Sequence, residues 1–375
     1  MMITDPIGIY VHIPFCKSKC AYCDFVSFKG ALEEYEEVYV KHLIKEIYSY
    51  KSERKIKADT VFFGGGTPTV ISEKSFFEIS KALYDSFDIS QGTEFTLEAN
   101  PKTLTEEKLK TYTECGVNRI SIGLQSIHEK ELKILGRIHT FDDFLLSYEL
   151  VKKHGIDNVN VDLMYALPGQ RVSDFTKSLE QVIELSPTHI SAYSLILEEG
   201  TRLYDLKDTL TFPTEDEECD IYNSTIEIMR RAGYLHYEIS NYAKAGFECR
   251  HNLKYWQDEE YVGLGLAAHS YYGKKRYSNP TCFSEYFSRE EKGYIQTDII
   301  SPSDNAYEYA MMHLRLARGF SLSDYKARFS EDFLSGRESF ISEIIAAGYM
   351  KIDNDRIFLT ERGFYVSNEI LSRLL

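Results

Sequence analysis

Short apolar runs alternate with longer stretches in the first half of the chain, and in those stretches apolar residues recur every three or four positions. The runs are Gly8–Ile13, Thr60–Phe63, Glu94–Glu98, Arg119–Gly123, Asn158–Leu163 and His189–Ser194. The stretches with helical periodicity are Glu33–Tyr50, Ser72–Phe87, Thr105–Cys115, Phe141–His154 and Asp174–Leu185. Strand followed by helix, repeated in this way, predicts an α/β fold of parallel strands with right-handed crossovers. In a barrel or an open sheet of this kind, functional groups gather at the carboxyl ends of the strands.

The last part of the chain has a different pattern. Its order predicts three helices and then two short strands: Asn305–Arg315, Leu322–Arg328, Arg337–Ala347, Tyr349–Ile352 and Arg356–Leu359. That order resembles a winged-helix module. Residues 301–375 hold nine Lys and Arg against eleven Asp and Glu, so we expect a lid or partner-docking element and not a DNA-binding one.

Composition narrows the class of protein further. The 375 residues exceed one average domain, and we expect a barrel over 1–200, an extension over 201–300 and a small C-terminal domain over 301–375. A net charge of −15 argues against nucleic-acid binding. No secretory leader and no run of eighteen apolar residues occurs, which predicts a soluble cytoplasmic protein without a transmembrane segment. The sequence leaves open whether the chain forms a homodimer.

Three cysteines directly follow the first apolar run. Cys16, Cys20 and Cys23 lie within eight residues, a spacing that lets three thiolates hold three corners of a [4Fe–4S] cluster and leaves one iron open. An open iron can bind the amine and carboxylate of S-adenosylmethionine, a source of radical chemistry. The alternative is a zinc-bearing structural protein with His12 as fourth ligand. The other cysteines are scattered, and we expect them to be plain buried thiols.

Distinctive polar residues follow the next strands. Gly65, Gly66 and Thr67 end the second strand, where glycines allow close backbone approach and can expose amide donors. Further along the chain, the third, fourth and fifth strands supply Glu98, Gln125 and Asp162, and the GRIH stretch supplies Arg137. A cationic sulfonium nucleoside needs carboxylates or amides for its ribose hydroxyls and a cation for its carboxylate. We therefore expect these residues to share one site.

Ten stretches together carry a family resemblance: IYVHIPFC, FFGGGTPT, EANP, RISIGLQS, GRIH, VNVDLMYALPGQ, HISAYSL, HYEISNYA, HNLKYW and GLGLAAHS. They resemble the oxygen-independent coproporphyrinogen oxidase-like group of radical SAM proteins from residue 7 to about 280. Two features favour the haem chaperone branch of that group. The oxidases carry a fourth cysteine where this chain has Phe25, and the chaperones carry an HNxxYW motif, here His251–Trp256.

The resemblance implies a fold, cofactors and site residues. The fold is an incomplete (β/α)6 radical SAM barrel, with Cys16, Cys20 and Cys23 on the [4Fe–4S] cluster and Tyr10 beside it. The positions implied to contact S-adenosylmethionine are Gly65, Gly66, Thr67, Glu98, Gln125, Arg137 and Asp162, with Phe25 near the cofactor and Ala268 and Leu195 or Ile196 beside the adenine. His251 is the candidate ligand of haem iron. Its alternative role is structural, with Asn252 capping a short helix and His251 bonding backbone.

Two functions and one structural role follow as hypotheses. The first is a haem-binding chaperone that delivers haem to respiratory proteins, with S-adenosylmethionine and haem as its small-molecule partners. The second is oxidative decarboxylation of coproporphyrinogen III without oxygen, an enzymatic activity that the missing fourth cysteine argues against. The third is the zinc-bearing structural protein.

Overall fold

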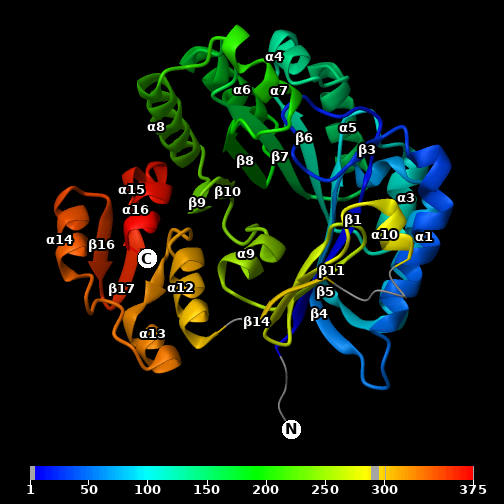
Figure 1. The fold of residues 1–375 in the computed structure, drawn as a ribbon. Helices are drawn as coiled ribbons and strands as arrows, with labels where there is room; N and C mark the ends of the chain where they lie inside the picture. Colours follow the sequence, from blue (N-terminus) through cyan, green and yellow to red (C-terminus); the bar gives the residue numbers. More distant parts are fainter. Residues whose placement is uncertain (1–4, 289–294, 300, 375) are drawn as a thin grey trace.

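The computed structural model describes residues 5–288, 295–299 and 301–374. Six neighbouring parallel strands form the centre of the molecule: β1 (Ile7–Ile13), β4 (Ile56–Gly65), β5 (Phe87–Ala99), β6 (Arg119–Gln125), β7 (Asn158–Tyr165) and β8 (His189–Ser194). Helices join them, and most cover the outer face of the curved sheet: α1 (Leu32–Ser49), α2 (Glu73–Ser86), α3 (Glu106–Glu114), α5 (Phe141–Lys153) and α6 (Val172–Glu184) (Figure 1). The short helix α4 (Glu129–Ile134) follows β6. The predicted succession of strands and helices is confirmed.

Short strands extend this sheet at both edges. On one side β11 (Tyr261–Leu264) pairs parallel with β1, followed by the antiparallel strands β12 (His269–Tyr272), β13 (Lys275–Ser278) and β14 (Ile295–Ile299). On the other side β10 (Asn241–Ala243) and β9 (Leu235–Glu238) follow β8. Within the described ranges β14 and β9 are the two edges and do not pair with each other, so the barrel is incomplete.

The segment between β8 and β14 also holds helices, namely α7 (Arg202–Asp205), α8 (Glu215–Arg231), α9 (Arg250–Trp256) and α10 (Phe283–Phe287). The cysteine loop lies between β2 (Phe15–Cys16) and β3 (Phe28–Lys29), two short strands that pair with each other. No helix among the described residues is long and apolar enough to cross a bilayer.

The C-terminal domain is a small α/β unit, coloured orange to red in Figure 1. Its elements are α12 (Pro302–His313), β15 (Phe320–Ser321), α13 (Leu322–Phe329), α14 (Glu338–Ala346), β16 (Met350–Asp353), β17 (Arg356–Leu359), α15 (Glu361–Tyr365) and α16 (Ser367–Leu374). The three predicted helices and two predicted strands are present. Strand β15, which pairs with β17, and the two last helices were not expected from the sequence.

Strand periodicity divides the barrel into an apolar outside and a polar inside. On β5 the side chains of Phe95 and Leu97 belong to the buried hydrophobic core, whereas Glu98 lines an internal cavity. On β6 Ile120 and Ile122 are core residues, whereas Ser121 lines the same cavity. Because successive residues of a strand point to opposite faces, the helices cover the apolar set and the polar set is collected in the interior.

Candidate functional site

A large cavity of ≈560 Å³ opens at the carboxyl ends of the parallel strands. Its lining includes Cys16, Cys20, Cys23, Phe25, Gly65, Gly66, Thr67, Glu98, Gln125, Arg137 and Asp162. The structure therefore brings together the three predicted cluster ligands and the seven residues predicted to contact S-adenosylmethionine. Its volume falls in the range of small-molecule sites in proteins.

The cysteine loop is fixed by backbone contacts with distant parts of the chain. The Ala21 amide donates to the Leu135 carbonyl at 2.9 Å, and the Ala21 carbonyl accepts from the Leu203 amide at 2.7 Å. The Lys19 ammonium donates to the Phe25 carbonyl at 2.9 Å and so closes the loop on its other side. These bonds hold the three thiols at one wall of the cavity.

The thiols suit a polynuclear cluster. All three are free and partly buried, and burial raises the pKa of the Cys16 and Cys23 thiols, so iron must supply the positive charge that stabilises their thiolates. Among the described residues no three His, Cys, Asp or Glu side chains converge on a single ion. In a [4Fe–4S] cube each thiolate binds its own iron, so such convergence is not required. Cys16, Cys20 and Cys23 therefore fit the group.

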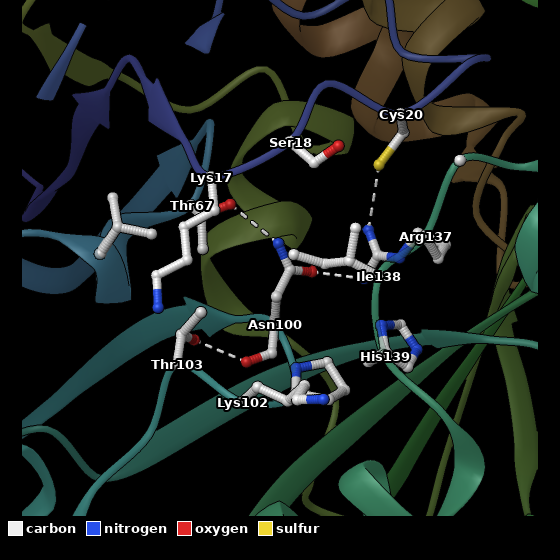
Figure 2. Close-up of a pocket in the computed structure, with 13 residues that line it drawn as sticks. Lys17, Ser18, Cys20, Thr67, Asn100, Lys102, Thr103, Arg137, Ile138 and His139 are labelled. Atoms are coloured by element: carbon white, nitrogen blue, oxygen red, sulfur yellow. Dashed lines mark hydrogen bonds between the residues drawn. The ribbon is translucent and has the colours of Figure 1, made fainter. Parts of the chain in front are cut away.

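Arg137 connects the cluster loop to the strand ends (Figure 2). One terminal nitrogen donates to Asn100 Oδ1 and to the Gly123 carbonyl, both at 2.5 Å, and the other donates to Cys20 Sγ at 3.3 Å. Asn100 in turn donates to Thr67 Oγ1 at 2.8 Å. The guanidinium that the sequence suggested for the cofactor carboxylate thus positions protein groups as well.

Asn100 is a site residue that the sequence reasoning did not single out. Asn100 lies two residues after Glu98 in the EANP stretch at the end of β5, and this position at a strand end could have indicated it as a site residue. Thr67 Oγ1, its partner, also donates to Cys16 Sγ at 3.7 Å. Asn100 therefore lies between the ligands of the cluster and the strand ends.

Two buried carboxylates give the cavity its electrostatic character. Burial, with a smaller contribution from Asp162, raises the pKa of Glu98 to about 8. Burial also raises the pKa of Asp162, although Asn160 Nδ2 at 2.7 Å and Ser121 Oγ at 3.1 Å donate to this carboxylate and partly offset the shift. A ligand with a positive charge would favour the ionised form of both groups.

The glycine turn after β4 corrects one expectation. The amides of Gly66 and Thr67 donate to the carbonyls of Ile13 and Phe15, both at 2.8 Å, so they are not exposed donors for a ligand. Gly65 has φ of +104°, and a Cβ at Gly66 would lie 2.7 Å from the Phe15 carbonyl oxygen. Glycine is needed here because the turn packs against the end of β1.

Three of the predicted residues lie away from the large cavity. Tyr10 lines a smaller neighbouring cavity of ≈170 Å³, and its hydroxyl contacts His12 Nδ1 at 3.1 Å. Ala268 is buried in the turn between β11 and β12 and belongs to the lining of neither cavity. Ile196 does line the large cavity, whereas Leu195 packs against a small apolar cluster.

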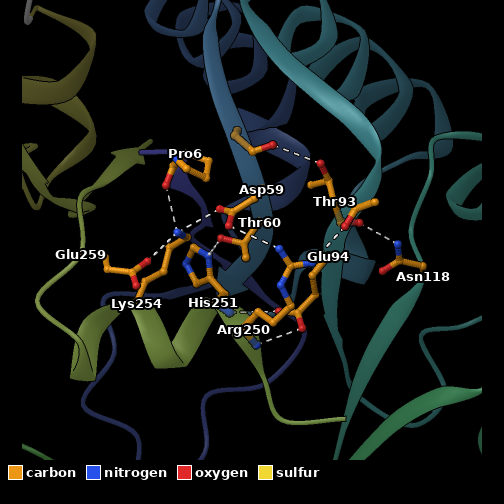
Figure 3. A network of polar contacts seen from close by, with 12 residues as sticks. Pro6, Asp59, Thr60, Thr93, Glu94, Asn118, Arg250, His251, Lys254 and Glu259 are labelled. Atoms are coloured by element: carbon orange, nitrogen blue, oxygen red, sulfur yellow. Dashed lines mark hydrogen bonds and ion pairs between the residues drawn. The ribbon is translucent and has the colours of Figure 1, made fainter. Parts of the chain in front are cut away.

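His251 lies on α9 and its side chain lines the smaller cavity (Figure 3). Its Nδ1 contacts Thr60 Oγ1 at 2.8 Å, and its Nε2 contacts the Tyr255 hydroxyl at 2.9 Å. Burial lowers the pKa of His251 to about 3, so the ring is neutral. The structural alternative took another form than expected: Cys249, not Asn252, is the N-cap of α9, and the partners of the ring are side chains. In this conformation both nitrogens are occupied.

Comparison with known proteins gives consistent matches over the whole chain. The model of the Radical SAM superfamily matches residues 10–182, and that of the HemN C-terminal domain matches 300–366. The Heme chaperone HemW of Lactococcus lactis is 34% identical, over 100% of this chain and 98% of that protein. The Heme chaperone HemW of Escherichia coli is 33% identical over the full length of both.

Among solved structures, the coproporphyrinogen III oxidase HemN from Escherichia coli, described as a radical SAM enzyme, superposes with a TM-score of 0.87. The alignment covers 99% of this chain and 90% of that one at 20% sequence identity. At this identity the likeness shows the fold alone.

Proposed function

Because the chain belongs to the heme chaperone HemW family of radical SAM proteins, we propose that it binds haem and passes it to haem-accepting respiratory proteins. The proposal includes a cytoplasmic location. The [4Fe–4S] cluster and S-adenosylmethionine of the family together supply radical chemistry when they are bound. The residues of the chain described above hold and orient these groups.

The observation that carries the proposal is the place of Phe25. Its side chain is 69% exposed, and it belongs to the lining of both cavities. The family resemblance of the sequence implies that the oxidases have a thiol at this position. An exposed aromatic ring beside a cavity favours contact with a flat apolar ligand such as a porphyrin, and it offers no thiol chemistry.

The proposed cofactor residues have distinct roles. Cys16, Cys20 and Cys23 bind three irons of the cluster. Arg137 is a positioning residue, since its bonds to Asn100 and Cys20 fix the loop relative to the strand ends. Glu98 and Asp162 provide negative charge once a cationic nucleoside binds, because a positive ligand favours the ionised form of both groups.

We keep His251 as the proposed ligand of haem iron. An imidazole nitrogen must present a lone pair to the metal, and both nitrogens of His251 are engaged by Thr60 and Tyr255. Ligation therefore requires that at least one of these contacts opens when haem binds, and that the cavity of ≈170 Å³ lined by His251 widens to bring the macrocycle to the imidazole.

An assay for coproporphyrinogen turnover separates this function from the enzymatic one. Anaerobically purified protein with a measured iron content is incubated with coproporphyrinogen III, S-adenosylmethionine and a reductant. We expect no protoporphyrinogen above the level of a sample without protein. Decarboxylation at about 1 per second or faster, a rate typical of enzymes, would contradict the chaperone function.

A further inference from the structure

The smaller cavity continues inward from the cofactor cavity. The two cavities share six lining residues, namely Phe25, Gly65, Glu98, Ser121, Asp162 and Tyr193. The inner one, ≈170 Å³, is too small for a macrocycle but large enough for a short side arm of one. A ligand that lies against Phe25 can therefore extend such an arm inward.

Arg119 lies at this inner cavity and has unused donors. Arg119 is the first residue of β6, and it is only 2% exposed. Within the part of the chain that the structure describes, Arg119 forms no hydrogen bond and no ion pair from its side chain, and Nε is fully buried without a partner. A guanidinium has five N–H donors, and a charged donor that is buried without an acceptor destabilises the fold.

The two carboxylates whose charge acts on Arg119, Glu94 and Asp162, accept hydrogen bonds from other donors. Glu94 accepts the backbone amides of Arg250 and His251, each at 3.0 Å, and so holds the start of α9 (Figure 3). Asp162 accepts from Asn160 and Ser121. These acids stabilise the charge of Arg119 from a distance but leave its N–H groups without an acceptor.

A planar guanidinium fork matches a carboxylate, which it can bind through two parallel hydrogen bonds. Haem carries two propionate arms, and each ends in a carboxylate. We infer that Arg119 binds one haem propionate in the inner cavity. This inference rests on the proposed haem binding, and it deepens that proposal by naming the group that recognises the ligand.

Water is the competing occupant, because a polar cavity of this size also holds ordered water. A propionate site and a water-filled cavity differ in whether they discriminate between haem and its dimethyl ester. A propionate site prefers the free acid of haem over its dimethyl ester, which has the same macrocycle and iron but no negative carboxylates. A water-filled cavity makes no such distinction.

The test is a pair of titrations of anaerobically purified wild-type protein, one with haem and one with haem dimethyl ester. We expect haem to bind at least about tenfold more tightly than the ester. Equal affinities would overturn the inference while leaving haem binding intact. If neither compound binds saturably, the proposed function itself fails, and the inference fails with it.

Two variants assign the preference to Arg119. In Arg119→Gln the ratio of the two affinities should fall to about one, with iron content and S-adenosylmethionine binding retained. Arg250→Gln is the matched control, because its exposed side chain pairs with Asp59 on the outside, and it should keep the wild-type ratio. An unchanged ratio in Arg119→Gln would overturn the inference. The wild-type comparison decides the matter if this variant does not fold.

Discussion

Two thiols of the cysteine loop are connected through a chain of three polar side chains. Cys16 contacts Thr67, which contacts Asn100, which contacts Arg137, which contacts Cys20. Thr67 and Asn100 directly follow the parallel strands β4 and β5, and Arg137 follows the short helix α4. The position of the cluster ligands is therefore coupled to the strand ends that surround the cofactor cavity.

Loss of one cysteine should remove the cluster. Replacing Cys16, Cys20 or Cys23 with Ala leaves two thiolates, fewer than a site-open cube uses, so we expect iron and sulfide contents near zero after anaerobic purification. Cys219→Ala, at a partly buried thiol on α8, is the matched control and should keep the wild-type iron content. Full iron content in the variants would show that these cysteines are not the ligands.

Glu98 gives a prediction about stability and pH. Its pKa of about 8 in the fold lies above the ordinary value of 4.5, so the native state holds a proton that the unfolded state releases between these values. The contribution of Glu98 to wild-type stability should therefore fall as the pH rises from about 4.5 to 8. Without S-adenosylmethionine, Glu98→Gln should be more stable than wild type at about pH 9, by more than about 1 kcal/mol.

Denaturant unfolding at several pH values measures this difference. The advantage of Glu98→Gln should shrink toward about pH 4, where the wild-type carboxyl is protonated in both states. A difference that does not change with pH would mean that Glu98 is ionised in the fold at neutral pH.

At the scale of elements, α9 carries the proposed haem ligand His251, and both of its ring nitrogens are engaged by Thr60 and Tyr255. Tyr255→Phe removes the hydroxyl that occupies His251 Nε2 and should strengthen haem binding, because one competing bond is lost. His251→Ala should weaken haem binding and shift the Soret band, with unchanged iron–sulfur content. Absorbance titration of both variants measures these effects. Wild-type spectra and affinities in both would exclude His251 as the ligand.

Most elements could be predicted because each has its own periodicity. The limits of β5 show where this fails: the strand begins at Phe87, not Glu94, and the residues from Asp88 to Gly92 are mostly exposed. An exposed polar segment has no apolar run to mark it. Its strand character comes from pairing with the start of β4, which only the fold provides.

The candidate site shows the same division. Strand ends and cysteine spacing predicted which residues share the large cavity, since parallel strands place their carboxyl ends together. The bonds of Arg137 to Cys20 and Asn100, and of Glu94 to α9, join residues far apart in sequence and leave no local pattern. The sequence also could not show that the amides of Gly66 and Thr67 donate to carbonyls of the protein, because these carbonyls lie on a distant segment of the chain.

At the scale of the whole molecule, the C-terminal domain docks onto the barrel extension. Tyr222 on α8 donates to the Glu361 carbonyl at 3.0 Å, and Arg230 pairs with the Glu361 carboxylate at 2.6 Å. The ring of Phe364 meets the ring of His236 edge to face, with centroids 5.2 Å apart. The contact thus combines an exposed ion pair with a buried aromatic one.

These two contacts should differ in energy. Phe364→Ala removes a buried ring and should lower the free energy of unfolding by about 3–5 kcal/mol. Arg230→Ala breaks an exposed pair and should cost about 1 kcal/mol or less. Denaturant unfolding of both variants measures the costs. An Arg230→Ala cost as large as that of Phe364→Ala would show that the domain is held by charge.

Haem titration tests the central claim, haem binding on a radical SAM barrel, most directly. Haem is added to anaerobically purified protein of known iron and sulfide content, and visible absorption is followed. We expect saturable binding of one haem per chain with a shifted Soret band, while the cluster iron and sulfide stay unchanged. No saturable binding, or displacement of the cluster by haem, would contradict the claim.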